Sequence, residues 1–377
     1  MPDDSNLKPD APVLYAVIKT DRQMSMVRFS ACGKFLAAAG RDAAIHVWDM
    51  VLPEPPSDAT ADEADKPKPS PPPVFPELSP LKGHNGWVSS IAFHPQDPRL
   101  FSADTWGQLV CWQCGDVPPK PVWSVTSAHD GWIRQLAVSP DGQSIATCGS
   151  DRQICLWASA DGKLQQKLIG HADDVYSVAF HPDRKSLVSG DLKGVIKHWD
   201  LATGAVVREF DAKLFYLYSR IQDVGGVRTL AFDHVGTNLV AAGTQPANGG
   251  FVEGTPTVRF FDWASGQETQ TLKVGDNTDV FVHEMAYHSR GFWMGVVSGQ
   301  PGKGKFFLLR AGESQPFFST TNLANCHSIS AHPNGRRLAA ISNAGTFGQA
   351  RSRAREGDYP GNTSPINLWD LSERPTP

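Results

Sequence analysis

The amino-acid sequence predicts an all-β fold, a seven-bladed β-propeller of four-stranded antiparallel blades. The first observation is a repeated segment of regular period, because Trp112, Trp157 and Trp199 lie 45 and 42 residues apart. The second is that three upstream histidines keep the same two spacings, namely His84, His129 and His171. A period of about 40–45 residues with four short strands per unit is typical of propeller blades.

Each repeated unit shows the same order of four expected strands, a to d. Strand a ends at a His-Pro or Ser-Pro turn, strand b is a run of small residues, strand c ends at Trp-Asp or its equivalent, and strand d follows. Strands a, b and c read as apolar runs, as expected for strands that are largely buried. Units five to seven match the pattern less closely, which affects their boundaries rather than their number. The expected c strands cover residues 45–49, 109–112, 154–157, 196–200, 258–262, 306–309 and 366–370.

The N-terminal segment supplies a strand that has no blade of its own. After Trp369-Asp370 seven residues remain, too few for a well-formed fourth strand in blade seven, whereas residues 13–18 read as a strand. We therefore expect the N-terminal strand to complete the last blade, which closes the ring and removes exposed sheet edges. The expected organisation is a single propeller over residues 13–370, a Pro-rich and acidic flexible insertion at 53–73 in blade one, and tails at 1–12 and 371–377.

Composition and charge narrow the class of protein. Lys and Arg number 35 and Asp and Glu number 39, so the formal net charge of −4 disfavours binding of nucleic acid through an overall positive field. The start of the sequence lacks the pattern of a signal peptide, and no apolar run is long enough to cross a membrane. Six cysteines, several of them in expected strands, are typical of buried thiols in a reducing compartment. We expect a cytoplasmic protein without membrane association.

The repeated Gly-His, His-Pro and Trp-Asp elements resemble the WD-repeat family of β-propellers over about residues 13–370. In that family, a buried His, Ser or Thr, Asp and Trp of one blade form a chain of hydrogen bonds. The resemblance implies that His129, Thr147, Asp151 and Trp157 form this network in blade three. Asp151 would orient His129, and the Thr147 hydroxyl would accept the indole N–H, so that each buried polar group finds a partner.

Two other blades depart from this pattern. Trp106 in blade two and Lys193 in blade four stand where the network aspartate is expected, so the complete network is predicted for blade three alone. Asp104 and Asp191 lie two positions earlier and remain possible substitutes. An Asp, a His and a hydroxyl also fit a hydrolase triad. The structural interpretation is favoured because the hydroxyl is committed to the tryptophan and the pattern implies no oxyanion hole.

The resemblance further implies that the loops joining strand d to a and strand b to c lie on one face, here called the top face. Long connections on one face often carry function, so we expect a binding site there, with tolerated insertion as the alternative. The longest of these connections cover residues 211–225, 245–257, 299–304 and 343–365.

Aromatic and arginine side chains, which carry much of the binding energy of protein interfaces, are expected on the top face. Packing beneath the loops is the alternative for the aromatic residues, and simple solvation for the arginine run. By alignment, the residues at the start of strand a that point to the mouth of the central channel are Ser25, Ser89, Arg134, Tyr176, Arg228, His283 and His327. The flanking loops add Trp87, Trp132, Phe215, Tyr216, Phe281, Arg351, Arg353 and Arg355.

The family resemblance implies a non-enzymatic scaffold that binds a protein or peptide partner on the top face, with no cofactor or metal, and that is monomeric by itself. One alternative is a small-ligand binder or an enzyme with its site at the channel mouth, although no carboxylate pair, metal cluster or nucleophile joins the four residues concerned. A second is a nucleic-acid accessory protein that uses the arginine-containing loop, whose binding would fall steeply with salt. The channel-mouth alternative draws on Arg134, Arg228, His283 and His327.

Overall fold

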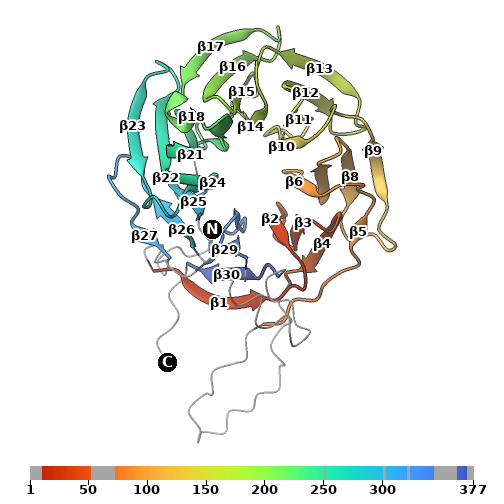
Figure 1. Ribbon diagram of the computed structural model, residues 1–377. Helices are drawn as coiled ribbons and strands as arrows, with labels where there is room; N and C mark the ends of the chain where they lie inside the picture. Colours follow the sequence, from red (N-terminus) through yellow and green to blue (C-terminus); the bar gives the residue numbers. More distant parts are fainter. Residues whose placement is uncertain are drawn as a thin grey trace, which may run out of the picture.

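The computed structural model describes residues 11–51, 73–249, 252–299, 303–320, 323–343 and 363–371. Within these residues, the strands form seven four-stranded antiparallel sheets around a common axis, together with one two-stranded hairpin and a single 3-10 turn (Figure 1). The predicted all-β, seven-bladed fold is confirmed. The expected insertion at 53–73 lies almost entirely outside the described residues.

The first four blades follow the expected order of strands a to d. Blade one contains β2 (Met24–Phe29), β3 (Phe35–Gly40), β4 (Ala44–Asp49) and β5 (Leu81–Lys82). Blade two contains β6 (Val88–Phe93), β7 (Arg99–Asp104), β8 (Leu109–Gln113) and β9 (Pro121–Val125). Blade three contains β10 (Ile133–Val138), β11 (Ser144–Gly149), β12 (Gln153–Ala158) and β13 (Leu164–Ile169). Blade four contains β14 (Val175–Phe180), β15 (Ser186–Asp191), β16 (Val195–Asp200) and β17 (Val206–Asp211).

The last three blades have the same topology despite their weaker sequence pattern. Blade five contains β20 (Thr229–Phe232), β21 (Asn238–Gly249), β22 (Val252–Asp262) and β23 (Glu268–Lys273). Blade six contains β24 (Phe281–His288), β25 (Phe292–Ser298), β26 (Gly304–Leu309) and β27 (Phe318–Ser319). Blade seven contains β28 (Ser328–Ala331), β29 (Arg337–Ile341), β30 (Ile366–Asp370) and the N-terminal β1 (Val13–Ile18).

Burial explains the strand patterns. Every residue of β3 is buried, whereas the outer strand β17 alternates between exposed and more buried positions. The apolar side chains of neighbouring blades pack against each other, as Phe101 of blade two does with Ile133 and Trp157 of blade three. The core is therefore a series of apolar layers between blades, with the d strands at the perimeter (Figure 1).

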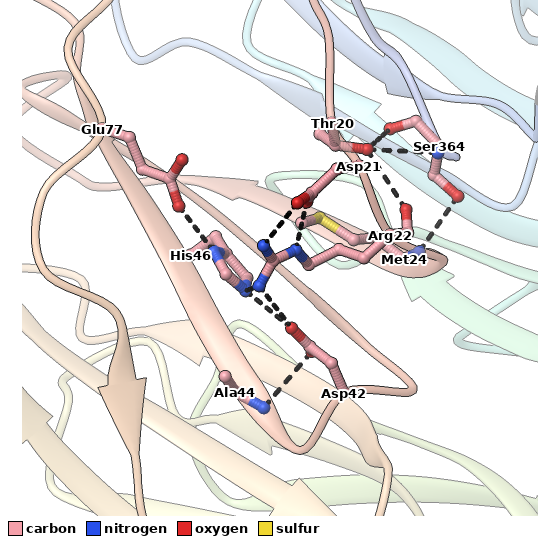
Figure 2. A network of polar contacts seen from close by, with 9 residues as sticks. All are labelled: Thr20, Asp21, Arg22, Met24, Asp42, Ala44, His46, Glu77 and Ser364. Carbon is pink, nitrogen blue, oxygen red and sulfur yellow. Dashed lines mark hydrogen bonds and ion pairs between the residues drawn. The ribbon is translucent and has the colours of Figure 1, made fainter. Parts of the chain in front are cut away.

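The ring closes through β1, as the sequence predicts. β1 pairs with β30 in antiparallel register, from Val13 opposite Asp370 to Ile18 opposite Ile366. The chain then turns directly into β2 of blade one. The backbone amide of Met24 donates to the Ser364 hydroxyl over 3.0 Å, and the Thr20 hydroxyl donates to the Ser364 carbonyl over 2.9 Å. The segment between β1 and β2 and the residues just before β30 are thus hydrogen-bonded side by side at the seam between blades seven and one (Figure 2).

A charged network lies beside this seam. His46 of β4 is almost fully buried and contacts Asp42 through Nε2 at 2.8 Å and Glu77 through Nδ1 at 2.6 Å. Arg22, from the turn after β1, donates to the Asp42 carboxylate over 3.1 Å (Figure 2). Burial alone would lower the pKa of His46, but contacts with Asp42 and Glu77 raise it above its ordinary value. The network links the closing segment to blade one, which lacks a Gly-His element.

Two top-face connections contain strands rather than irregular loop. In residues 245–257, β21 and β22 continue as a paired ribbon, with Gln245 opposite Thr255. In residues 211–225, a 3-10 turn (η1, Lys213–Phe215) leads into a hairpin of β18 (Tyr216–Ser219) and β19 (Gln222–Gly225). The long connection of blade five, which the sequence marks only as a candidate functional loop, is therefore a strand ribbon in which backbone pairing satisfies the polar groups of both arms.

Candidate functional site

Strand a of blades one, two, three, four and six contains a bulge near its start, and the bulge sets one residue outside the regular pairing. In β10, Ile133 pairs with Gly149 and Gln135 with Cys148, which leaves Arg134 as the extra residue. Such an insertion re-aims a side chain and is frequent beside binding sites. In blade five, the Arg228 amide donates to Ala242, the residue that already pairs with Thr229. In blade seven, His327 likewise precedes the first paired residue and donates to the Ile341 carbonyl. The residues at this position of the seven blades are Ser25, Ser89, Arg134, Tyr176, Arg228, His283 and His327.

Five of the predicted site residues form a continuous stack along this rim. The Arg134 guanidinium lies 4.6 Å from the ring centroid of Trp132 and 5.1 Å from that of Tyr176. Arg228 lies 4.6 Å from the Tyr176 centroid and 5.0 Å from that of Phe281. Each contact is a cation–π interaction, which is stronger where the cation is partly desolvated. The order along the rim is Trp132, Arg134, Tyr176, Arg228 and Phe281.

The two rim histidines continue this arc as uncharged groups. The ring centroids of His283 and His327 are 4.9 Å apart, and the Ser298 hydroxyl lies 2.5 Å from His283 Nε2. Burial, with the nearby charge of Arg41, lowers the pKa of His327 to about 4. Burial, with His327 and Arg228, lowers the pKa of His283 well below its ordinary value. Both imidazoles are therefore neutral near pH 7.

Three exposed tryptophans gather in a pocket beside this rim. Trp87 and Trp132 belong to d–a connections and Trp106 to the b–c turn of blade two, and their exposed fractions are 47%, 44% and 70%. These connections share a face because adjacent antiparallel strands run in opposite directions. All three line a pocket of about 510 Å³, and the Arg41 guanidinium lies 5.0 Å from the Trp87 ring.

Trp106 was not among the predicted binding residues. The sequence feature that could have identified it is its position, since a large apolar side chain stands where a polar turn residue is expected. The backbone at Gly86 allows the indole to lie against it, because a Cβ on Gly86 would be 2.6 Å from Cδ1 of Trp106. The turn is held by Asp104, whose carboxylate accepts the Trp106 amide over 2.8 Å.

The expected structural network is assembled within blade three. His129 Nδ1 lies 2.9 Å from the Asp151 carboxylate, and its Nε2 lies 2.7 Å from the Thr147 hydroxyl. The indole of Trp157 donates to the same hydroxyl over 2.8 Å. The hydroxyl of Thr147 has no measurable exposure, so this triad-like arrangement lies inside the blade and away from solvent. Its geometry supports the role of a structural network.

The expectation that this network is complete only in blade three is wrong. In blade two, His84 Nδ1 lies 3.0 Å from Asp104, and in blade four, His171 Nδ1 lies 2.8 Å from Asp191. The same histidines contact Ser102 and Ser189 through Nε2. An aspartate at the end of strand b thus replaces one in the b–c turn, because both positions reach the same imidazole nitrogen.

The d–a insertion after blade four places its two predicted aromatic residues differently. Phe215 is fully buried in the core between blades four and five, so its predicted place on an exposed binding surface is wrong. Burial of the Phe215 ring beneath the hairpin is more favourable than its exposure to water. Tyr216 is partly exposed, donates to Asp223 over 2.6 Å and lines a separate pocket of about 670 Å³. The predicted residues Arg351, Arg353 and Arg355 lie outside the described residues.

The ring of seven four-stranded blades, closed by the N-terminal strand, defines the molecule as a β-propeller. Four segments match the family model described as WD domain, G-beta repeat, namely residues 20–49, 75–113, 120–158 and 162–200. These matched repeats and the closed ring of seven blades are consistent with the WD-repeat family of β-propellers.

The curated proteins to which the chain is similar include Angio-associated migratory cell protein of Homo sapiens and of Pongo abelii. Each is 33% identical over 66 residues, which cover 18% of this chain. The match spans 15% of the length of each relative. No helix in the described part of the chain is long and apolar enough to cross a membrane.

Proposed function

We propose that this propeller is a non-enzymatic scaffold that binds a protein or peptide on its top face. The observation that carries the proposal is the pocket of Trp87, Trp106 and Trp132, which is formed by connections of blades one to three beside the arginine–aromatic rim. Propellers of the WD-repeat family generally serve protein interaction, and the exposed tryptophan pocket supports the top face as the binding surface.

The exposed tryptophans have the properties of an interface anchor. Trp106 is 70% exposed, and burial of its indole would remove more apolar surface from water than burial of any aliphatic side chain. Tryptophan and arginine are enriched among the few residues that dominate binding energy, and both types meet here. A pocket of about 510 Å³ has room for one or two side chains of a bound peptide.

The rim chemistry disfavours the enzyme alternative. A general base acts best when its pKa lies near the working pH, whereas the pKa values of His283 and His327 are both lowered far from neutrality. Arg134 is held by an ion pair with Asp174 at 3.0 Å. Within the described residues, no group of three or more His, Cys, Asp and Glu side chains could hold a metal ion.

The cysteines are consistent with a reducing, cytoplasmic location, which we include in the proposal. Cys111, Cys114, Cys148, Cys155 and Cys326 are buried and unpaired. Burial raises the pKa of the first two and of Cys155 to about 12, so these thiols are poor nucleophiles.

The test compares partner capture by the wild-type protein and a Trp87→Ala, Trp106→Ala double variant, followed by affinity measurement with the purified partner. Tyr218→Ala is the matched control, because Tyr218 is an exposed aromatic residue of the β18–β19 hairpin outside the tryptophan pocket. We expect the double variant to bind at least about tenfold more weakly and the control to bind normally. Equal affinity for all three proteins would contradict a top-face tryptophan site.

A further inference from the structure

Arg228 is a charged side chain held at the rim by an unusual backbone turn. Gly226 precedes it with φ of +98°, and a Cβ at that residue would lie 2.7 Å from Cδ2 of Tyr176. Only glycine allows the chain to pass so close to this ring. The Val227 amide donates to the Asp191 carbonyl over 3.0 Å, which anchors the turn to blade four. Arg228 is thereby placed beside Tyr176.

The guanidinium of Arg228 has no carboxylate partner among the described residues. Its flanking contacts are the rings of Tyr176 and Phe281, at 4.6 and 5.0 Å, and its Nε is buried without a hydrogen-bond acceptor. Arg134 differs, since its guanidinium pairs with Asp174. A partly buried cation without a counter-charge loses hydration that no ion pair replaces.

The surrounding groups leave a net positive charge at this part of the rim. The carboxylate of Glu284 forms an ion pair with Arg28 at 2.6 Å, and the carboxylate of Asp174 forms one with Arg134. His283 and His327 add no charge near pH 7 because both pKa values are lowered. Two guanidinium groups, of Arg134 and Arg228, therefore flank one ring, that of Tyr176, and among the described residues only Arg134 has a carboxylate partner.

We propose that Arg228, assisted by Arg134, binds an acidic group, a carboxylate or a phosphate, carried by the partner on the top face. This inference rests on the proposed function and names the chemistry of its ligand. Aromatic rings approach a guanidinium over its faces, which leaves the N–H edges to form the paired hydrogen bonds that suit planar acidic groups. Trp132 both lines the tryptophan pocket and lies beside Arg134, so one peptide can reach both.

The test uses two small probes, sodium phosphate and a short polyglutamate peptide, each compared with sodium chloride at equal ionic strength. The variant is Arg228→Met, which keeps an apolar stem between the rings and removes the charge. Because phosphate also stabilises proteins through exclusion from their surface, the quantity compared is the difference between variants in the rise of Tm. We expect a saturable rise of about 1–3 °C in the wild-type protein that is absent in Arg228→Met.

Arg208→Met is the matched control, because Arg208 also lies over aromatic rings, those of Phe210 and Trp263, but on β17 at the perimeter. This variant should keep the anion-dependent rise. A Tm that rises equally in Arg228→Met, or no rise in the wild-type protein with either probe, would overturn the proposal. A response to phosphate alone would indicate a phosphorylated partner, and a response to polyglutamate would indicate carboxylates; both support an acidic ligand.

An independent readout is the side-chain Nε–Hε resonance of Arg228, assigned by its loss in Arg228→Met. It should shift saturably with phosphate, since the anion supplies an acceptor near a buried N–H group. The Trp106→Ala variant should show the same shift. The resonance shift tests the anion site alone, whereas the affinity for the partner tests the tryptophan pocket. The two proposals can therefore fail separately.

Discussion

Asp104 and Asp151 orient the histidines of neighbouring blades from different positions of the chain. Asp104 ends β7 and also accepts the amides of Trp106 and Gln108. Although burial alone would raise the pKa of Asp104, the hydrogen bond to His84 and these two amides hold it below its ordinary value. Since Asp104 completes the network, no contact with His84 is required of the side chain at position 106. The exposed indole of Trp106 is therefore compatible with an intact blade.

Replacement of Asp104 with Ala should destabilise the protein by about 1–3 kcal/mol, because it leaves the buried His84 without its Nδ1 partner. Chemical denaturation with a fluorescence readout measures this change. Trp106→Ala is the control, and its effect should stay within about 0.5 kcal/mol because the side chain is 70% exposed. A larger loss for Trp106→Ala than for Asp104→Ala would show that the indole is structural.

His46 gives the stability of the protein a pH dependence of defined sign. Its pKa is raised in the folded protein, so it binds its proton more tightly there than in the unfolded chain. The stabilisation is fully present below the unfolded value of about 6.5 and is lost as pH rises through the folded value. The stability advantage of wild type over His46→Gln should therefore be larger at about pH 6 than at about pH 8. Denaturant titration at both values measures it, and an advantage that grows with pH would contradict the assignment.

At the scale of elements, the sequence predicts which positions of strand a are equivalent but not how their side chains stack. Alignment of the repeats placed Arg134, Tyr176 and Arg228 at equivalent positions, and the structure brings them together along one rim. The stacking order could not be read from the sequence, because it depends on distances between blades. Phe215 was misassigned for a related reason, since the hairpin that covers it is a local pairing absent from the repeat pattern.

The same limit applies to the two-stranded elements. The b and c strands of blade five recur as apolar runs, but their paired extension covers residues 245–249 and 252–255, where Pro, Asn and three Gly in residues 245–254 read as loop. The β18–β19 hairpin turns through Arg220 and Ile221, both with positive φ and neither with the Asn-Gly sequence that signals such a turn. Sequence periodicity predicts the strands whose packing repeats from blade to blade. The blade-five ribbon and the β18–β19 hairpin are held by local backbone pairing instead.

At the scale of the whole molecule, stability depends on closure of the ring. Each blade buries its apolar faces against two neighbours, so an unpaired last blade would expose both a core layer and the edge of β30. Ala16 of β1 belongs to the same apolar cluster as Trp48 of blade one and Leu368 of blade seven. The N-terminal strand therefore joins the two ends of the fold through side-chain packing as well as backbone pairing.

Deletion of residues 1–18 should lower the Tm of the entire protein and increase aggregation, because it removes the partner of β30 and the packing of Ala16. Deletion of residues 1–10 leaves β1 intact and serves as the matched control. A synthetic peptide covering residues 11–22 should restore much of the lost Tm when added in excess, since binding to the folded state raises apparent stability. An unchanged Tm in the 1–18 deletion would contradict closure by β1. A lowered Tm without rescue by the peptide would place the effect in the covalent connection to β2 rather than in the strand itself.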